Sequence, residues 1–269
     1  MAHVREVVNA RELLWNLTLR ELRTKYRKSF LGWAWSMLNP LATVAIYSFV
    51  FGVLFQASAP DGNPSGLSGF AFFLLAALLP WNFFSLVANL GITSISANAG
   101  LVRRVAFPHE ILVFSNSLHA CVQFSIELAI FVVVLIVVGG PVFPWIFGAL
   151  ISSFFLAIFA IGFALALSAL AVFFKDVTYL WTIILQIWFF LTPIVYDPSI
   201  VEERAPGWVN TILQFNPMRA FAIIYRNFLY DGKMPSLQIS AYAIIASMAS
   251  LTLGWAVFIR LSRRLPEEV

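Results

Sequence analysis

The chain has 269 residues, of which 61% are hydrophobic and only 11% are charged. Soluble globular domains carry about 25% charged residues, so this composition excludes an ordinary soluble fold and indicates a membrane protein. The formal net charge of +4 does not indicate nucleic-acid binding, because the basic residues lie at the ends of apolar segments rather than along one face.

Residues 11–30 are too charged to cross a bilayer but have the spacing of an amphipathic helix. The apolar stripe of this helix consists of Trp15, Leu19, Leu22, Tyr26 and Phe30. The basic residues off the stripe include Arg20, Arg23 and Arg27. This pattern predicts an interfacial helix in the cytoplasmic headgroup layer, with its cations toward lipid phosphate. Leu13, Leu14 and Leu17 break the stripe, so its first half is expected to contact protein. A plain positively charged anchor is the alternative.

Six stretches approach the roughly 20 apolar residues that a membrane-spanning helix needs. The predicted spans are 34–56, 70–95, 111–138, 145–173, 178–196 and 237–259. Turns and loops rich in Gly, Pro, Ser and Asp separate several of them. We therefore expect an all-α membrane protein with six transmembrane helices, formed by a single domain over residues 1–269.

Thirteen of the 17 Lys and Arg residues lie on one side of the predicted membrane, in the N-terminal segment, the 96–110 loop, the 174–178 turn and the C-terminus. Lys and Arg concentrate in the cytoplasmic loops of membrane proteins. Both termini are therefore expected to be cytoplasmic, in a bacterial inner membrane. This orientation requires an even number of spans, in agreement with six.

The stretch from Asn98 to Glu110 mixes two arginines with apolar side chains that are expected to be exposed. The residues concerned are Leu101, Val102, Arg103, Arg104, Val105 and Phe107. Apolar groups in water beside cations are typical of a docking surface for another protein. A positively charged loop lying against lipid is the alternative.

One acidic residue, Glu127, falls in the middle of a predicted span. With Ser115, His119 and Gln123 it follows a spacing of four residues, which places all four on one helical face. This polar face is expected to avoid lipid, because burying an ionisable group there costs several kcal/mol. Its side chains form either part of a hydrophilic path or hydrogen bonds between helices. The hydrogen bonds are favoured, since no intramembrane Lys or Arg is present to build a charge relay.

Aromatic residues make up 16% of the chain. Tyr47 and Phe51 in the first span, and Trp181 and Trp188 in the fifth, repeat at helical intervals within or beside the apolar region. Rings stacked along a channel would suit sugar faces, so these four residues are candidates for a substrate path. Contact with lipid is the default expectation for any one of them.

The loop over residues 197–236 contains Asn216-Pro217, an N-cap residue followed by proline at the first helical position. A helix is expected to start there and to end at Asp231-Gly232. Its apolar stripe consists of Met218, Phe221, Ala222, Tyr225 and Leu229, with Arg219 and Arg226 elsewhere. A second short helix near Pro206 and Trp208 would complete an outer re-entrant pair. An ordered surface loop is the alternative.

The ATP-binding motif G-x-x-x-x-G-K-[ST] is missing, since the only Gly-Lys pair, Gly232-Lys233, is followed by methionine. Signatures of metalloproteases and serine hydrolases are also missing. We therefore do not expect an enzyme, a metal site or a cofactor bound to this chain.

Taken together, several motifs resemble those of ABC-2 type permeases, specifically the Wzm or TarG type subunits that export lipid-linked O-antigen-like polysaccharides or teichoic acids. The residues that carry the resemblance are Lys25-Tyr26-Arg27-Lys28-Ser29-Phe30-Leu31-Gly32-Trp33-Ala34-Trp35, Leu38-Asn39-Pro40, Arg103 to Leu112 with Phe107-Pro108-His109-Glu110, Phe174-Lys175-Asp176, Thr192-Pro193-Ile194 with Tyr196, and Asn216-Pro217-Met218. They cover nearly the whole chain, although the family commonly has Arg where Lys175 stands.

The resemblance implies a homodimer whose interface forms a channel for a polyprenyl-linked glycan. Two copies of a separate P-loop ATPase would hold ATP and Mg below it. The stretch from Asn98 to about His109 would be the coupling helix, with the N-terminal helix contributing to the ATPase contact. Two other functions stay open. One is ABC-2 export of a drug or small hydrophobic solute, and the other is proton-coupled secondary transport through His119 and Glu127.

Overall fold

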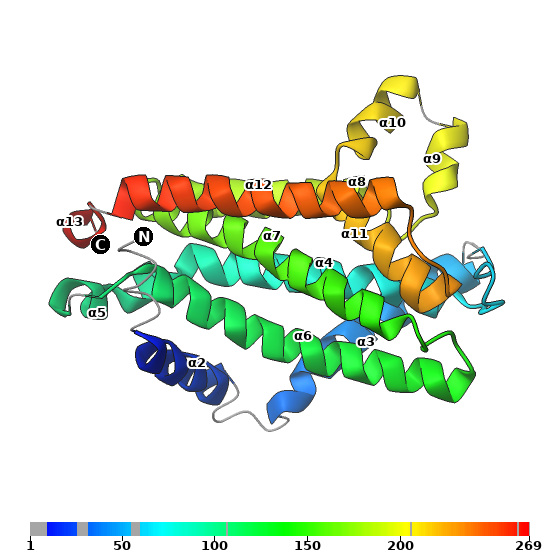
Figure 1. Cartoon of the computed structure of the whole chain (residues 1–269), viewed down its shortest axis with the longest axis horizontal. Helices are drawn as coiled ribbons and strands as arrows, with labels where there is room; N and C mark the ends of the chain where they lie inside the picture. The colour runs from blue at the N-terminus through cyan, green and yellow to red at the C-terminus, as the bar shows by residue number, and fades with distance from the viewer. Residues whose placement is uncertain are drawn as a thin grey trace.

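The computed structural model describes residues 10–25, 32–54, 60–105, 107–204, 206–262 and 264–268. The long helices run side by side along one axis of the molecule (Figure 1). Within the described residues, four helices are long and apolar enough to cross a membrane. They are α4 (Phe70–Ser94), α6 (Glu110–Val138), α7 (Ile146–Phe173) and α12 (Leu237–Ser262). Their bounds agree with four of the six predicted spans to within three residues.

The other two predicted spans are shorter or interrupted. The first consists of a 3₁₀ turn η1 (Gly32–Ala34), α3 (Trp35–Tyr47) and a π-helical segment η2 (Ser48–Leu54). The fifth, α8 (Asp176–Leu191), has 16 residues and is about 24 Å long at 1.5 Å per residue, less than the roughly 30 Å of a bilayer core. The predicted end at 196 was wrong, because the backbone becomes extended at Thr192 and Pro193 follows. That these two elements cross the membrane stays a prediction.

The core lies where α7 packs between α4 and α12. Small residues allow this close approach, as is usual between membrane helices. Gly254 of α12 faces the backbone of Gly162 in α7, and Gly91 of α4 faces Ala164 in α7. The hydroxyl of Ser250 adds a hydrogen bond of 2.8 Å to the carbonyl oxygen of Phe159.

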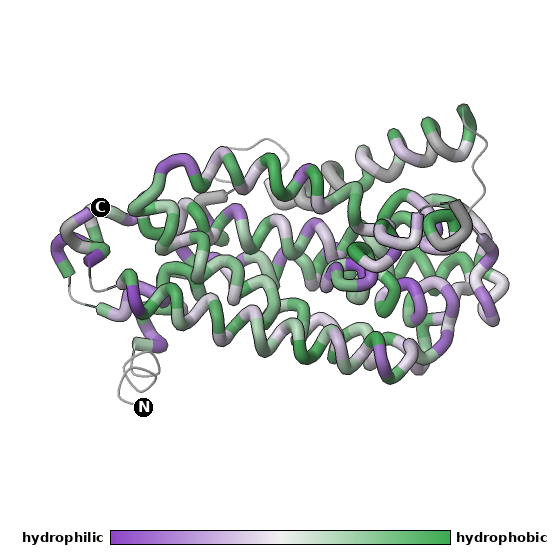
Figure 2. Tube along the Cα trace, turned by 90° about the horizontal axis from the view of Figure 1, so that it is seen from above, coloured by the Kyte–Doolittle hydropathy of each residue, from purple (hydrophilic) through white to green (hydrophobic). Residues whose placement is uncertain are grey.

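The outward faces of the long helices are apolar. Val137 of α6 is 80% exposed, Ile151 of α7 is 62% exposed and Ile245 of α12 is 66% exposed. Figure 2 shows hydrophobic residues along the whole length of these helices. Exposed apolar surface of this extent suits lipid rather than water.

The two ends of the bundle carry different structures (Figure 1). At one end lie α2 (Arg11–Lys25), η3 (Ser96–Asn98), α5 (Ala99–Arg104) and α13 (Leu265–Glu268). At the other end lie the loop 60–69, the turn 139–145, α9 (Pro198–Arg204), α10 (Gly207–Gln214), α11 (Pro217–Arg226) and the π-helical segment η4 (Asn227–Asp231). The first and last described helices therefore lie at the same end of the molecule.

Candidate functional site

The N-terminal helix α2 packs against α6 through a face that includes buried Leu17 and Thr18. Leu13 and Leu14 also pack against the core, which confirms that the first half of this helix contacts protein. Trp15, the first residue of the predicted stripe, is 61% exposed and lies off the face of α2 that packs against α6. Of the predicted cations, Arg23 is exposed. Arg27, Tyr26 and Phe30 lie outside the described residues.

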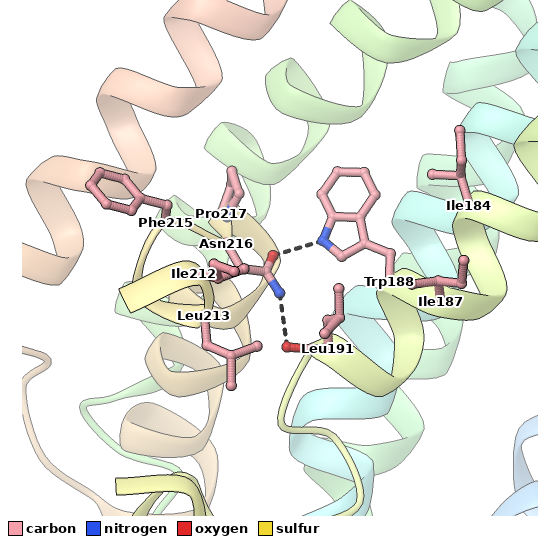
Figure 3. A pocket seen from close by; sticks show the side chains of 9 residues that line it. All are labelled: Ile184, Ile187, Trp188, Leu191, Ile212, Leu213, Phe215, Asn216 and Pro217. Carbon is pink, nitrogen blue, oxygen red and sulfur yellow. Dashed lines mark hydrogen bonds between the residues drawn. The ribbon is translucent and has the colours of Figure 1, made fainter. Parts of the chain in front are cut away.

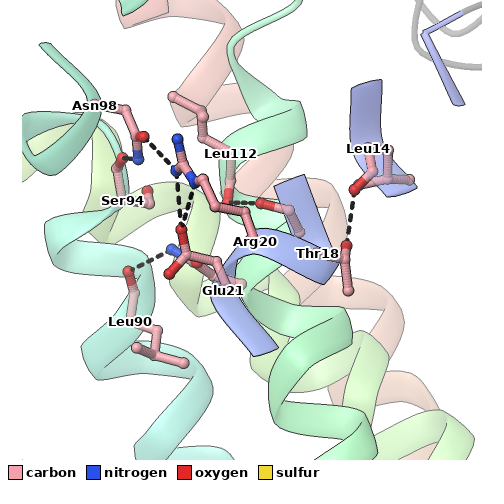
Figure 4. A network of polar contacts seen from close by, with 10 residues as sticks. Leu14, Thr18, Arg20, Glu21, Leu90, Ser94, Asn98 and Leu112 are labelled. Carbon is pink, nitrogen blue, oxygen red and sulfur yellow. Dashed lines mark hydrogen bonds and ion pairs between the residues drawn. The ribbon is translucent and has the colours of Figure 1, made fainter. Parts of the chain in front are cut away.

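Arg20 joins α2 to the segment that leads into α5 (Figure 4). Its Nη2 atom donates a hydrogen bond of 2.7 Å to Oδ1 of Asn98. Asn98 in turn donates to the carbonyl oxygen of Ser94 at the end of α4. The same Nη2 lies 2.9 Å from Oε1 of Glu21. This chain of contacts ties the N-terminal helix to the predicted coupling segment.

The predicted coupling segment forms the short helix α5, which ends in the exposed residues Arg103 and Arg104. Val105 is also exposed, but Leu101 and Phe107 are half-buried. The prediction that Val102 is exposed was wrong, because its side chain is only 4% exposed within the core. The exposed part of the predicted docking surface is therefore narrower than expected and consists of Arg103, Arg104 and Val105.

Two further contacts fix the position of this segment. Helix α13 packs against both α5 and α7, and its Leu265 is fully buried. On the other side, the rings of Phe107 and His109 meet edge to face with their centroids 5.3 Å apart. Burial lowers the pKa of His109, which keeps the ring uncharged at neutral pH. The segment is thus held firmly against the bundle while its arginines point to the outside.

The predicted polar face of α6 is turned inward, which confirms that it avoids lipid. Ser115, His119 and Glu127 are 2%, 3% and 7% exposed. The side-chain amide of Gln123 donates a hydrogen bond of 2.8 Å to Oε1 of Glu127. This local bond satisfies one oxygen of the carboxyl group, and it favours a structural role for the face.

The substitution Glu127→Gln is therefore expected to leave both expression and export within about twofold of the unchanged protein. Glutamine keeps an acceptor oxygen for Gln123, so the hydrogen bond between these two side chains is retained. The matched variant Glu127→Leu removes that acceptor and is expected to lower the amount of folded protein. Export measured in cells for both variants checks this. A loss of export in Glu127→Gln at normal expression would instead assign the face to a transport path.

The predicted substrate-path aromatics lie mostly in the core. Trp181 is 5% exposed and contacts the rings of Phe84, Phe163 and Trp188. Tyr47 is half-buried and stacks on Phe189, with the ring centroids 6.4 Å apart. The side chain of Phe51 lies outside the described residues. Within one copy of the chain, these rings fill space between helices.

Asn216 connects α8 to α11, and the helix predicted after it is confirmed (Figure 3). Its Oδ1 atom accepts hydrogen bonds from the backbone N–H of Met218 (3.0 Å) and from Nε1 of Trp188 (2.7 Å). Its Nδ2 atom donates to the carbonyl oxygen of Leu191 and to the hydroxyl of Thr192, both at 3.1 Å. Beside this junction, an apolar groove of about 340 Å³ separates α8 from α10.

The segment 197–236, for which two helices were predicted, contains the three helices α9, α10 and α11 among its described residues. The second short helix is confirmed as α10, but α9 was missed. Its sequence signal was present, because Asp197-Pro198 repeats the pattern of Asn216-Pro217 and Oδ1 of Asp197 accepts a hydrogen bond from the backbone N–H of Ser199. The predicted apolar stripe is buried in α11 and η4, and Arg226, placed off the stripe, is also buried at 5% exposure.

Long apolar helices, joined through small residues and buried polar groups, define an α-helical integral membrane protein. The chain belongs to the ABC-2 type transporter family, whose profile matches residues 12–230. This result confirms the resemblance seen in the sequence.

Relatives of known name match over nearly their whole length. The chain is 30% identical over 258 residues to the O-antigen export system permease protein RfbA of Myxococcus xanthus, covering 94% of this chain and 92% of that protein. It is 27% identical over 257 residues to RfbA of Klebsiella pneumoniae, covering 95% and 94%. It is 25% identical over 247 residues to the polysialic acid transport protein KpsM of Escherichia coli, covering 90% of each chain.

Proposed function

We propose that the chain is the permease subunit of an ATP-driven exporter that moves a lipid-linked polysaccharide across the bacterial inner membrane. The observation that carries this proposal is the match of at least 90% of both chains to permeases named for O-antigen export and polysialic acid transport. The arrangement of the helices supports this proposal, because the two ends of the bundle of long apolar helices carry different structures.

The working transporter is proposed to contain two copies of this chain and two copies of a separate P-loop ATPase, which binds ATP and Mg. The packing inside one copy supports a path between copies. Rings of α4, α7 and α8 meet in the core, as Phe84, Phe163 and Trp188 show, and they occupy the space that a glycan would need. The cargo is proposed to be an O-antigen, a teichoic acid or a galactan-like polysaccharide.

The membrane topology is proposed to have six spans, with α3–η2 and α8 as the first and fifth, and with both termini in the cytoplasm. The excess of Lys and Arg on the side of α2, α5 and α13 supports this orientation. The helices α9 to α11 then lie on the outer side, where α10 and α11 form the re-entrant pair.

Coupling is proposed to act through α5. When ATP brings the two ATPases together, they push on Arg103 and Arg104. This motion is transmitted to α4 and α6, because α5 lies in the chain between these two helices. The contact of Arg20 with Asn98 carries the same motion to α2.

Affinity purification of the full-length chain from its native membranes tests the assignment. A P-loop ATPase is expected to be recovered in equal amount, together with a lipid-linked glycan. Recovery of the ATPase with a drug-like solute would change the cargo. Proton-driven transport by the chain without any ATPase would overturn the proposal.

A further inference from the structure

A pocket of about 550 Å³ lies at the end of the bundle that carries α9 to α11. It is formed by the loop before α4, the start of α9, and α11 with η4. Six charged residues line it: Asp61, Asp197, Asp231, Arg219, Arg226 and Lys233. Phe73, Ile223, Tyr230 and Ile239 supply apolar surface. The volume falls within the roughly 300–1,000 Å³ of small-molecule sites.

The formal charges of the lining balance, with three carboxylates and three cations. Lys233 and Asp231 form an ion pair, with Nζ and Oδ2 2.9 Å apart. Asp61, Asp197, Arg219 and Arg226 make up the rest of the charged lining. An anion or a cation entering such a pocket gains little net attraction and still loses its hydration. The balance therefore favours a neutral ligand that carries both hydrogen-bond donors and acceptors.

Arg226 forms the buried wall of the pocket. Its Nε atom donates to the carbonyl oxygen of Phe73 (3.2 Å) and its Nη2 atom to that of Ile194 (2.6 Å). The guanidinium lies over the Phe73 ring, 3.6 Å from its centroid. Its Nη1 atom is buried and has no hydrogen-bond partner among the described residues. The side chain of Arg226 therefore lacks one hydrogen-bond acceptor among the described residues. An unsatisfied buried donor of this kind is costly.

A hydroxyl group meets both requirements of this lining. Its oxygen accepts a hydrogen bond from a partly exposed cation of the lining such as Arg219, while its proton is donated to a carboxylate such as that of Asp61 or Asp197. A sugar ring carries several such groups around an apolar C–H face, which matches the partly exposed Ile223 and Ile239. A metal ion fits less well, because no group of three or more His, Cys, Asp or Glu within the described residues has the geometry to hold one.

We infer that this pocket binds a neutral sugar residue of the exported polysaccharide at the outer end of the path. This inference rests on the proposed function and adds a glycan subsite to it, built from the outer loops together with the ends of α4 and α12. Each copy of the chain carries one such subsite.

Equilibrium binding to the full-length chain in lipid nanodiscs tests the subsite. The probes are neutral disaccharides of galactose, mannose and glucose, and their binding is measured by saturation-transfer NMR. The variant Ile239→Trp fills the pocket, while Gln238→Trp adds the same ring at the adjacent exposed position. At least one disaccharide is expected to bind the unchanged chain and Gln238→Trp equally, and to bind Ile239→Trp at least tenfold more weakly.

Three results would overturn the inference. They are no binding of any neutral disaccharide, equal binding by the two tryptophan variants, or tighter binding of phosphoethanolamine or of an acidic galacturonic disaccharide at the same site. A separate export assay with the partner ATPase distinguishes a failure of the subsite from a failure of the proposed function. Export that continues while the pocket binds no sugar removes the subsite alone, whereas failure to export any glycan removes the proposed function.

Discussion

Adding a single methyl group at Gly254 is expected to destabilise the folded bundle by about 3 kcal/mol, at the upper end of the usual cost of overpacking. In the substitution Gly254→Ala, the new Cβ would overlap the backbone of Gly162 in α7. A side chain can rotate away from such an overlap, but a helix backbone cannot. The helices α7 and α12 would have to separate, which also breaks the hydrogen bond from Ser250 to Phe159.

Thermal unfolding in detergent, followed by size-exclusion chromatography, measures this effect. The midpoint is expected to fall by roughly 6–12 °C, from the usual relation between stability and melting temperature. Gly100→Ala is the matched control, because a Cβ at Gly100 meets nothing within 4 Å and alanine favours a helix. Equal melting of the two variants would show that α7 and α12 do not cross at these glycines.

The double substitution of Arg103 and Arg104 by glutamate is expected to abolish ATP hydrolysis coupled to transport while leaving membrane insertion intact. Both side chains are exposed at the end of α5, outside the apolar core, so membrane insertion does not depend on their charge. At an interface, reversed charges repel the partner groups that the arginines contact, and losing such pairs costs about 2–5 kcal/mol. We expect at least a tenfold loss of coupled hydrolysis.

The control for this experiment reverses Arg260 and Arg264, which lie at the same end of the bundle and change the net charge by the same amount. Coupled ATP hydrolysis by the purified complex is measured for both double variants. The control is expected to retain most of its activity. Normal coupling in the Arg103 and Arg104 variant, or an equal loss in both, would remove α5 as the contact with the ATPase.

The long spans were predictable because hydropathy depends only on residue type over about 20 positions. The end of α8 was not, since the sequence stays apolar beyond Leu191 while the backbone leaves the helix. The local signal was Pro193, which disfavours helical backbone at Thr192, and the side chain of Asn216 then donates to the carbonyl oxygen of Leu191. Hydropathy alone does not register this proline, which is why the predicted span ran on to 196.

The candidate site residues were predicted with uneven success for a similar reason. Helical spacing shows which residues share a face, but not what that face contacts. Trp181 and Trp188 were correctly placed together, yet their neighbours Phe84 and Phe163 come from α4 and α7. The burial of Arg226 was not predicted from its place off the apolar stripe, because the acceptors that allow it, at Phe73 and Ile194, lie far from it in sequence.

Transport in reconstituted vesicles tests the central claim most directly. The chain and its co-purified ATPase are placed in proteoliposomes with lipid-linked polysaccharide, and glycan reaching the opposite leaflet is measured by its sensitivity to an added glycosidase. We predict transfer that requires ATP, the ATPase and this chain together. Transfer that proceeds without ATP, or its absence from a complex that hydrolyses ATP and moves another solute, would contradict the assignment.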